Sequence, residues 1–219
     1  MKIVSIIPAR GGSKRVLNKN VKLINGLPLI TYVIRASKGC TLIAETWVST
    51  NNSNIAYVAD ACGCKIIHRP EHLCSDTSTS EEALLHFAEY VDFDILVFMQ
   101  ATSPLTLSYD LEKGLNSIMH GNADSVLSVC EDVRFYWNKD KTPINYDPLN
   151  RPRSQDKEKI YKETGAFYIT TREALLKSKC RISGITDFVI VPESRSFEID
   201  TEEDFAITEA ILKSQNLTS

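Results

Sequence analysis

Short apolar runs alternate with amphipathic segments along most of the chain. A run of strand length bounded by polar residues is typical of a buried strand, whereas apolar residues three and four positions apart indicate a helix with one buried face. We therefore predict strands at 2–7, 46–49, 65–67, 94–99, 125–129, 165–170, 188–191 and 196–199. Helices are predicted to begin near Pro28, Ser53 and Thr201 and to occupy 78–90, 108–119 and 172–177.

The order of these elements predicts the fold class. Strands alternate with helices, and the most apolar strand, at 94–99, fits the centre of a parallel sheet. This alternation is typical of a Rossmann-like, doubly wound α/β fold with a mostly parallel sheet. Ligands bind such folds at the carboxyl ends of the strands, so polar residues that directly follow a strand are candidates for a site.

Local signals predict where several helices start and stop. Ser53 is expected to cap its helix and Gly63 to end it. The helix at 78–90 has Ser and Thr residues at its start and two glutamates in its first turn. Residues 201–204 have the pattern of a capping box, which indicates the start of the last helix.

The regular pattern is interrupted at 131–163, where three prolines, several aromatic residues and many charges occur together. We interpret this segment as an excursion from the sheet, either a lid or an oligomerisation arm, within a single domain spanning 1–219. The aromatic triplet Phe135, Tyr136 and Trp137 is expected either to form part of a dimer interface or to pack on its own domain.

The distribution of charge along the chain is more informative about function than the overall composition is. The 219 residues carry a net charge of −3 and are 43% hydrophobic, as expected for a globular protein. However, the first 44 residues hold eight Lys and Arg residues and no acid, whereas the remainder holds 17 basic and 28 acidic residues. This split predicts one anion-binding edge and argues against a nucleic-acid surface. No apolar stretch suits a membrane span or a secretory signal, and the six scattered cysteines suit reduced thiols, so we expect a cytoplasmic protein.

The densest basic segment follows the first predicted strand directly. It reads Pro-Ala-Arg-Gly-Gly-Ser-Lys-Arg from Pro8 to Arg15, and Lys19 and Asn20 follow shortly after. Paired glycines allow backbone N–H groups to approach an anion, and the cations would neutralise it. The spacing is neither G-x-G-x-x-G nor that of a P-loop. A surface loop with solvated cations is the simpler reading, but its place after a buried strand favours phosphate binding.

Five motifs in this order resemble those of the acylneuraminate cytidylyltransferases, the CMP-sialic acid synthetases. They are IPARGGSKRVLNKN from Ile7, HRP with SDTSTS at 68–80, QATSPL from Gln100, RSQ with TGAFY at 153–168, and EIDT from Glu198. The resemblance implies the nucleotide-diphospho-sugar transferase type of fold. It also implies that CTP reacts with a nine-carbon 2-keto-3-deoxy sugar acid to give the CMP-sugar and pyrophosphate, with Mg²⁺ or Mn²⁺. Such chemistry needs positioning and charge neutralisation more than covalent catalysis.

The resemblance assigns roles by matched position. Arg10, Lys19 and Asp200 match catalytic positions, with Arg10 and Lys19 the leading stabilisers of the transition state. The nucleotide is expected to contact Ala9, Arg10, Gly11, Gly12, Ser13, Lys14, Lys19, Asn20, Arg69, Ser80, Gln100 and Thr102. The sugar acid is expected to contact Gln100, Arg153, Gln155, Lys162 and Tyr168. A helix-capping role for Ser80 and a solvated position for Arg15 are the structural alternatives.

Two acids are the candidates for the metal. Glu198 and Asp200 stand at i and i+2 of an expected extended segment, so their side chains project to one face and can converge on one hard cation. Asp200 is the stronger candidate, because Glu198 replaces the aspartate of the family motif. Arg151 is an alternative to Arg153 for the substrate carboxylate, which a guanidinium binds with two hydrogen bonds.

The sequence features also suit several other functions. The nearest alternatives are a cytidylyltransferase for an eight-carbon keto acid of the KDO type, a guanylyltransferase of the molybdopterin type, and a nucleotide-binding module without turnover. A dehydrogenase is disfavoured because G-x-G-x-x-G and its ribose-binding acid are missing. The resemblance implies a homodimer in which the 131–163 segment reaches over the partner's site, and neither nucleic acid nor membrane is expected as a partner.

Overall fold

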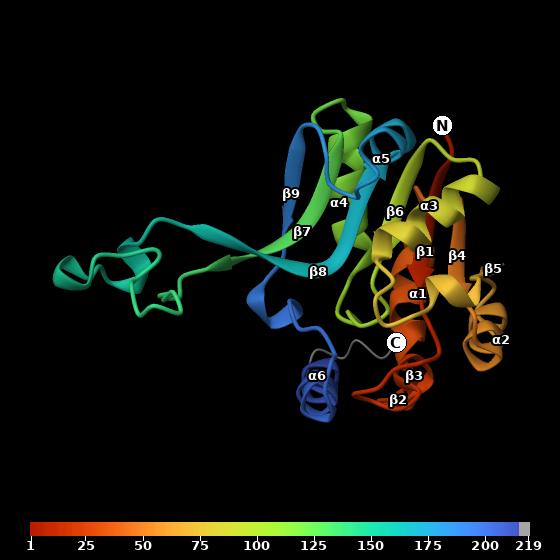
Figure 1. Cartoon of the computed structure of the whole chain (residues 1–219), viewed down its shortest axis with the longest axis horizontal. Helices are drawn as coiled ribbons and strands as arrows, with labels where there is room; N and C mark the ends of the chain where they lie inside the picture. The colour runs from red at the N-terminus through yellow and green to blue at the C-terminus, as the bar shows by residue number, and fades with distance from the viewer. Residues whose placement is uncertain (215–219) are drawn as a thin grey trace.

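A seven-stranded mixed sheet forms the centre of the molecule in the computed structural model, which describes residues 1–214 (Figure 1). The strand order is β5-β4-β1-β6-β8-β7-β9. The strands are β1 Ile3–Pro8, β4 Glu45–Thr50, β5 Lys65–His68, β6 Ile95–Met99, β7 Ser125–Asp132, β8 Ile160–Thr171 and β9 Thr186–Ile190. A separate two-stranded hairpin is formed by β2 Leu23–Ile24 and β3 Leu27–Pro28. The predicted α/β class is therefore confirmed.

Helices cover both faces of the sheet. They are α1 Leu29–Gly39, α2 Ser53–Ala61, α3 Ser80–Tyr90, α4 Ser108–Met119, α5 Arg172–Ser178 and α6 Glu202–Ser214. Successive residues of a strand face opposite sides, so β6 contributes Val97 to the core beneath α1 and α4 and Leu96 to the core beneath α3. Burial on both sides explains why β6 reads as a continuous apolar run. None of the helices described is long and apolar enough to cross a bilayer.

The strand at 94–99 is central, as predicted, but only one of its neighbours is parallel. β6 pairs parallel with β1 and antiparallel with β8. β8 also runs antiparallel to β7, because the chain leaves the sheet along β7 and returns along β8 through the excursion. A connection that doubles back in this way produces antiparallel neighbours, whereas the helical crossovers give parallel ones.

Two local predictions were wrong. Residues 196–199 do not form a strand: they follow a short 3₁₀ helix, Glu193–Arg195, and Ile199 N donates a hydrogen bond to Thr102 O at 2.8 Å instead of joining the sheet. The cap of α2 is Asn52, not Ser53, because the Asn52 side chain accepts hydrogen bonds from the N–H groups of residues 54 and 55. Thr201 and Asp204 do exchange the hydrogen bonds of a capping box.

The excursion is an arm that projects away from the sheet (Figure 1). β7 and β8 continue into it as a two-stranded ribbon, with Asp132 opposite Ile160, so the irregular part is shorter than 131–163. The aromatic rings meet edge to face: Phe135 and Trp137 pack against Tyr146 with ring centroids 4.5 and 5.8 Å from that of Tyr146. Arg151 lies 4.0 Å from the centroid of Phe135, which engages its guanidinium within the arm.

Candidate active site

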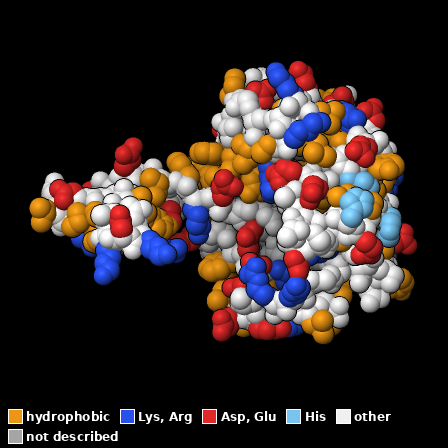
Figure 2. Space-filling model, in the orientation of Figure 1, with side chains coloured by type: hydrophobic (Ala, Val, Ile, Leu, Met, Phe, Trp, Pro, Cys, Tyr) orange, Lys and Arg blue, Asp and Glu red, His pale blue; other side chains and the backbone are white. Residues whose placement is uncertain are grey.

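A cavity of about 380 Å³ opens where β1 and β6 end. Figure 2 shows Lys and Arg side chains gathered beside a hollow in this face. We call it the cation-lined cavity. The residues predicted from sequence that line it are Arg10, Ser13, Lys14, Lys19, Asn20, Ser80, Gln100, Thr102 and Asp200. The other lining residues are Pro8, Arg15, Val16, Asp76, Phe98 and Ala101.

The loop after β1 presents the cations from one side. Its path is fixed by buried contacts: Ala9 N bonds to Ser49 O, and the buried Asn20 side chain donates to Arg10 O at 3.1 Å. Gly11 N donates to Asn51 Oδ1 at 3.1 Å, so this amide already has a partner, whereas Gly12 borders open space. Asn20 therefore supports the loop by holding the backbone of Arg10.

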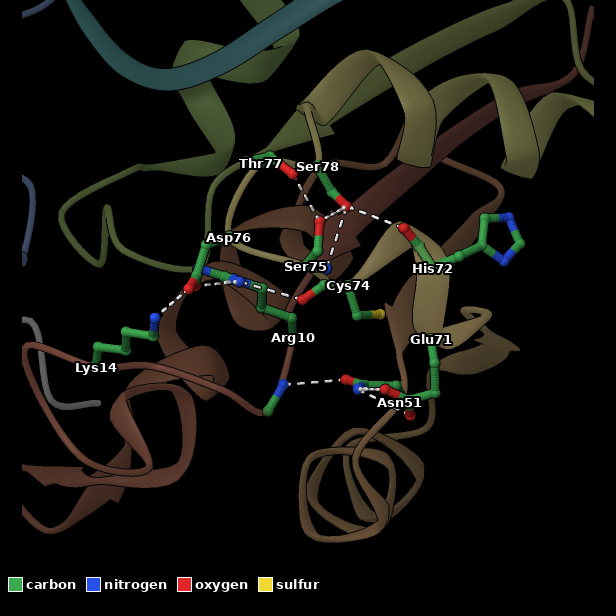
Figure 3. Close-up of polar contacts among 11 residues, drawn as sticks. Arg10, Lys14, Asn51, Glu71, His72, Cys74, Ser75, Asp76, Thr77 and Ser78 are labelled. Carbon is green, nitrogen blue, oxygen red and sulfur yellow. Dashed lines mark hydrogen bonds and ion pairs between the residues drawn. The ribbon is translucent and has the colours of Figure 1, made fainter.

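Two carboxylates pair with the four cations of the cavity. Asp76 bridges Arg10 and Lys14, with 3.0 Å between Arg10 Nη1 and Asp76 Oδ1 (Figure 3). Asp200 bridges Arg15 and Lys19, each at 3.0 Å. Arg15, for which a solvated position was the alternative, therefore forms an ion pair at the cavity. Each pair neutralises only part of the local positive charge.

Lys19 and Asp200 form the more enclosed pair. The Lys19 side chain is 14% exposed, and its ammonium also donates to Ile199 O at 2.8 Å. Burial alone would raise the pKa of Asp200, but the hydrogen bond and charge of Lys19, together with Arg15, outweigh it and lower the pKa. Asp200 is therefore a carboxylate at neutral pH, the form that ligates a hard cation.

Ser80, Gln100 and Thr102 also line the cavity, and they come from other parts of the chain than the cationic loop. The helix-capping alternative for Ser80 is wrong: Thr79 caps α3, and its hydroxyl accepts from Glu82 N while Glu82 accepts from Thr79 N. The Ser80 side chain is therefore not needed as the cap. Gln100 directly follows β6, and Thr102 is fixed by the hydrogen bond from Ile199.

Arg69 is placed differently from the other predicted nucleotide contacts. Its side chain is buried, donates to Ser49 Oγ at 3.1 Å and Ser49 O at 2.7 Å, and does not line the cation-lined cavity. Burial lowers the pKa of its guanidinium. In this structure Arg69 connects the end of β4 to the segment before α3, so its visible role is structural.

Glu198 and Asp200 do not share one cavity. Glu198 lines a neighbouring cavity of about 310 Å³, which we call the Glu198 cavity, together with Lys162 and Thr164. Glu198 Oε1 is buried and has no hydrogen-bond partner in the part of the chain that the structure describes, and burial, with the charge of Asp200, raises the pKa of its carboxyl. The carboxyl group lies against Gly165: a Cβ there would be 1.9 Å from Glu198 Oε1, and the φ of +69° also favours glycine.

The donor set fits a magnesium ion held mainly by substrate. No group of three or more His, Cys, Asp or Glu side chains within residues 1–214 is arranged to hold a metal. Mg²⁺ is commonly bound by one or two carboxylates and completes its shell with phosphate oxygens and water. Asp200 offers an ionised carboxylate inside the cation-lined cavity, and Glu198, two residues before it in the sequence, has a carboxyl oxygen with no hydrogen-bond partner among residues 1–214.

The residues expected to bind the sugar acid are only partly brought together. Lys162 lines the Glu198 cavity, and Gln100 lines the cation-lined cavity. Tyr168 is buried, stacks on Phe98 and donates a hydrogen bond from its hydroxyl to Glu163, so it supports the cavity wall from behind. Arg153 and Gln155 lie on the arm, where Arg153 pairs with Asp156 at 2.6 Å.

Sequence reasoning gave no role to Asp76 or to Phe98, both of which line the cavity. Asp76 stands inside the quoted SDTSTS motif, so an acid among small hydroxyl residues just before a helix was the available signal. Phe98 is part of an apolar strand and carries no signal distinct from core packing. Its stacking on Tyr168 becomes visible only once β6 and β8 are paired.

Comparison with known proteins adds independent findings. Residues 4–217 match the protein family described as "Cytidylyltransferase". The chain is 34% identical to the N-acylneuraminate cytidylyltransferase of Oncorhynchus mykiss, over 94% of this chain and 49% of that protein. It is 33% identical to the "Post-translational flagellin modification protein B" of Campylobacter coli, over 98% of this chain and 97% of that protein. Identity is 32% to the "CMP-N,N'-diacetyllegionaminic acid synthase" of Legionella pneumophila, over 97% of each chain.

Solved structures confirm the architecture. The structure of a CMP:2-keto-3-deoxy-manno-octonic acid synthetase complexed with CTP superposes with a TM-score of 0.75 and 20% identity, covering 98% of this chain and 100% of that one. At this identity the likeness shows the fold alone. The chain spans about half the length of the animal N-acylneuraminate cytidylyltransferases that it matches.

Proposed function

The chain belongs to the cytidylyltransferase family, and from this premise we propose that it transfers CMP from CTP to a nine-carbon 2-keto-3-deoxy sugar acid, releasing pyrophosphate. The relatives named for acylneuraminate, pseudaminic acid and legionaminic acid support this class of acid. The observation that carries the proposal is the convergence of Arg10, Lys14, Arg15 and Lys19 on one cavity beside Asp200.

The charge of the cavity suits a metal-bound triphosphate. Four cations and the two carboxylates Asp76 and Asp200 leave a net charge of +2. A triphosphate carries roughly four negative charges near neutral pH, and a divalent cation reduces this to about two. The positive charge of the cavity and the negative charge of the metal-bound triphosphate would therefore neutralise each other on binding.

The chemistry requires placement of two reactants and control of charge. In the proposed reaction the anomeric hydroxyl of the sugar acid attacks the α-phosphorus of CTP, the new P–O bond forms, and the bond to pyrophosphate breaks in line. Arg10 and Lys19 would neutralise the charge that develops on the phosphate oxygens. Lys19 is suited to this because its ammonium is largely enclosed and oriented by two acceptors.

A divalent cation, when bound, would neutralise charge on the leaving pyrophosphate. We propose that Asp200 holds it, with Glu198 as a second ligand that acts directly or through water. The pair supports this because Lys19 and Arg15 keep Asp200 ionised, and one carboxyl oxygen of Glu198 has no hydrogen-bond partner within residues 1–214. Chelation of divalent metal should therefore abolish turnover.

The sugar acid would occupy the Glu198 cavity, next to the nucleotide. Lys162 offers a cation for its carboxylate there, and Gln100 stands between the two cavities, with its Nε2 close to Gly165. Arg153 and Gln155 would complete the site from the arm of a second subunit. This homodimer is a proposal that rests on the family resemblance and on the projecting arm.

Pyrophosphate release tests this function. We expect release only when CTP, Mg²⁺ and a nine-carbon 2-keto-3-deoxy acid are all present, using a panel of sialic, pseudaminic, legionaminic and KDN acids together with the eight-carbon KDO acid. Turnover confined to the eight-carbon KDO acid would replace the proposal with the KDO-type activity. CTP binding without turnover on any acid would favour a non-catalytic nucleotide-binding module.

A further inference from the structure

Asp76 forms ion pairs with two of the four cations in the cation-lined cavity. Its Oδ1 accepts a hydrogen bond from Arg10 Nη1 at 3.0 Å, and its Oδ2 pairs with Lys14 (Figure 3). Arg10 Nη1 also donates to Cys74 O at 3.1 Å, so both the backbone and a side chain of this segment face the arginine. Asp76 thus lies where the phosphate oxygens of a ligand would have to approach these cations.

A tight turn presents the carboxylate at that point. Ser75 N donates to Ser78 Oγ at 3.1 Å, the two hydroxyls lie 2.8 Å apart, and Ser78 Oγ donates to His72 O at 3.3 Å. The capping box of α3 then fixes the next residues. The turn is therefore ordered by its own hydrogen bonds, and the Asp76 side chain is not required to hold it.

Asp76 and Asp200 differ in how firmly they are held. The two carboxylates are about equally exposed, at 47% and 48%, but the partners of Asp76 within residues 1–214, Arg10 and Lys14, are 34% and 78% exposed. Asp200, in contrast, pairs with the enclosed ammonium of Lys19, which is itself bound to a backbone carbonyl. A rotation of the Asp76 side chain toward solvent would free Arg10 and Lys14 without breaking the turn.

We propose that Asp76 is a competing anion that occupies Arg10 and Lys14 between turnovers and is displaced by the phosphates of the ligand. The identity of that ligand as CTP rests on the function proposed above, but the competition itself concerns any polyphosphate that needs these two cations. When pyrophosphate leaves, the carboxylate returns to the cations and favours its departure.

Competition of this kind has a quantitative signature. If the competent cavity is only a fraction of the population, the apparent dissociation constant of every ligand that needs it is raised by the same factor. Removal of the Asp76 charge should therefore lower the dissociation constants of pyrophosphate and inorganic tripolyphosphate by one common factor. A ligand without phosphates, such as cytidine, should not respond.

The test is calorimetric titration of wild type and Asp76→Asn with pyrophosphate, tripolyphosphate and cytidine. It is made first in the absence of divalent metal and then with Mg²⁺. We expect both anions to bind about fivefold more tightly to Asp76→Asn without metal, a modest effect because the competing ion pairs are exposed to solvent. Asp76→Glu, which keeps the charge, should bind as wild type does. Glu202→Gln is the matched control, because Glu202 pairs with Lys22 outside the cavity and should not alter affinity.

Other results would overturn the proposal. Equal or weaker binding of both anions by Asp76→Asn without metal would show that Asp76 does not compete with phosphate. A loss of affinity that appears only with Mg²⁺ would show a metal ligand instead. A general charge effect would tighten Glu202→Gln as well. These outcomes are distinct from failure of the proposed function, which would leave CTP unconverted by wild type whatever the affinities.

Discussion

Lys19 is the most enclosed of the four cations around the cation-lined cavity. Its ammonium is held by Ile199 O and Asp200, so the charge is oriented before any ligand arrives. Preorganised charge of this kind lowers the barrier because the enzyme does not need to reorient it during the reaction. Lys19 is therefore the residue at which the proposed electrostatic role is best tested.

We expect Lys19→Ala to lower kcat by about 10²-fold or more, the range for loss of one preorganised donor to developing charge. Lys22→Ala is the matched control, since Lys22 lies three residues away and pairs with Glu202 outside the cavity. Steady-state kinetics with CTP measures both. If the kcat of Lys19→Ala equalled that of Lys22→Ala, Lys19 would not contribute to catalysis.

Glu198 offers a prediction about pH. Burial and the charge of Asp200 raise its carboxyl pKa in the folded state, so the ionised form destabilises the fold at pH values above the unfolded pKa. Glu198→Gln should therefore raise the free energy of unfolding at pH 7, because the buried amide carries no charge. At about pH 3.5, below the ordinary glutamate pKa, the carboxyl is protonated in both states and the gain should vanish.

Urea unfolding of both proteins at the two pH values, in the presence of a chelator, measures this difference. A destabilised Glu198→Gln protein at pH 7 would mean that the ionised carboxylate has a stabilising partner. Such a partner would contradict the structure, in which Glu198 Oε1 has no hydrogen-bond partner among residues 1–214.

At the scale of elements, the cap of α2 lies beside the cationic loop that follows β1. Asn52 accepts two backbone hydrogen bonds at the start of α2, and a Cβ at Gly11 would lie 2.9 Å from the Asn52 amide, so this cap borders the cationic loop. Ser53 is already inside the helix.

Asn52→Ala should therefore cost about 1 kcal/mol of unfolding free energy, whereas Ser53→Ala should be close to neutral, because alanine is a good helix former. Thermal or urea denaturation of the two variants compares them directly. The opposite ranking would restore Ser53 as the cap and would contradict the helix start seen in the structure.

The sequence predicted elements well where the local pattern is decisive. Residues 108–119 form α4 with the predicted bounds, because an apolar stripe there continues from one end of the helix to the other. Residues 196–199 were mistaken for a strand, since short apolar alternation does not reveal whether a partner strand is available. The antiparallel direction of β8 was missed for a related reason: it depends on how the arm returns to the sheet.

The candidate site was predictable where residues follow strand ends. The loop after β1 and Gln100 after β6 meet at one cavity because the two strands are parallel neighbours. Asp76 could not be assigned, since its contacts with Arg10 and Lys14 depend on the path of a loop between elements. The burial of Arg69 against Ser49 likewise follows from tertiary packing.

At the scale of the whole molecule, the arm is the feature that a single chain does not explain. It carries Arg153 and Gln155 away from the sheet, although both match sugar-acid positions in the resemblance. If the arm reached the site of a second subunit, Arg153 and Gln155 could contact the sugar acid there although they lie away from their own sheet. Subunit complementation tests this arrangement.

Lys19→Ala and Arg153→Ala should each be inactive alone, and co-expression should restore activity. If the arm acts in the partner, a mixed dimer has one site with both residues intact, so a random mixture should recover about a quarter of wild-type activity. Activity of the mixture is measured against each variant purified separately. If a dimer shown to contain both variants recovered no activity, Arg153 would act at the site of its own subunit.

The most direct test of the central claim is the identity of the product. Wild-type protein is incubated with CTP, Mg²⁺ and the nine-carbon acid panel, and the mixture is analysed by mass spectrometry and ³¹P NMR. The account predicts pyrophosphate together with a CMP-sugar in which one phosphodiester joins CMP to the anomeric carbon. Free CMP without a sugar conjugate, or unchanged CTP with every acid, would contradict it.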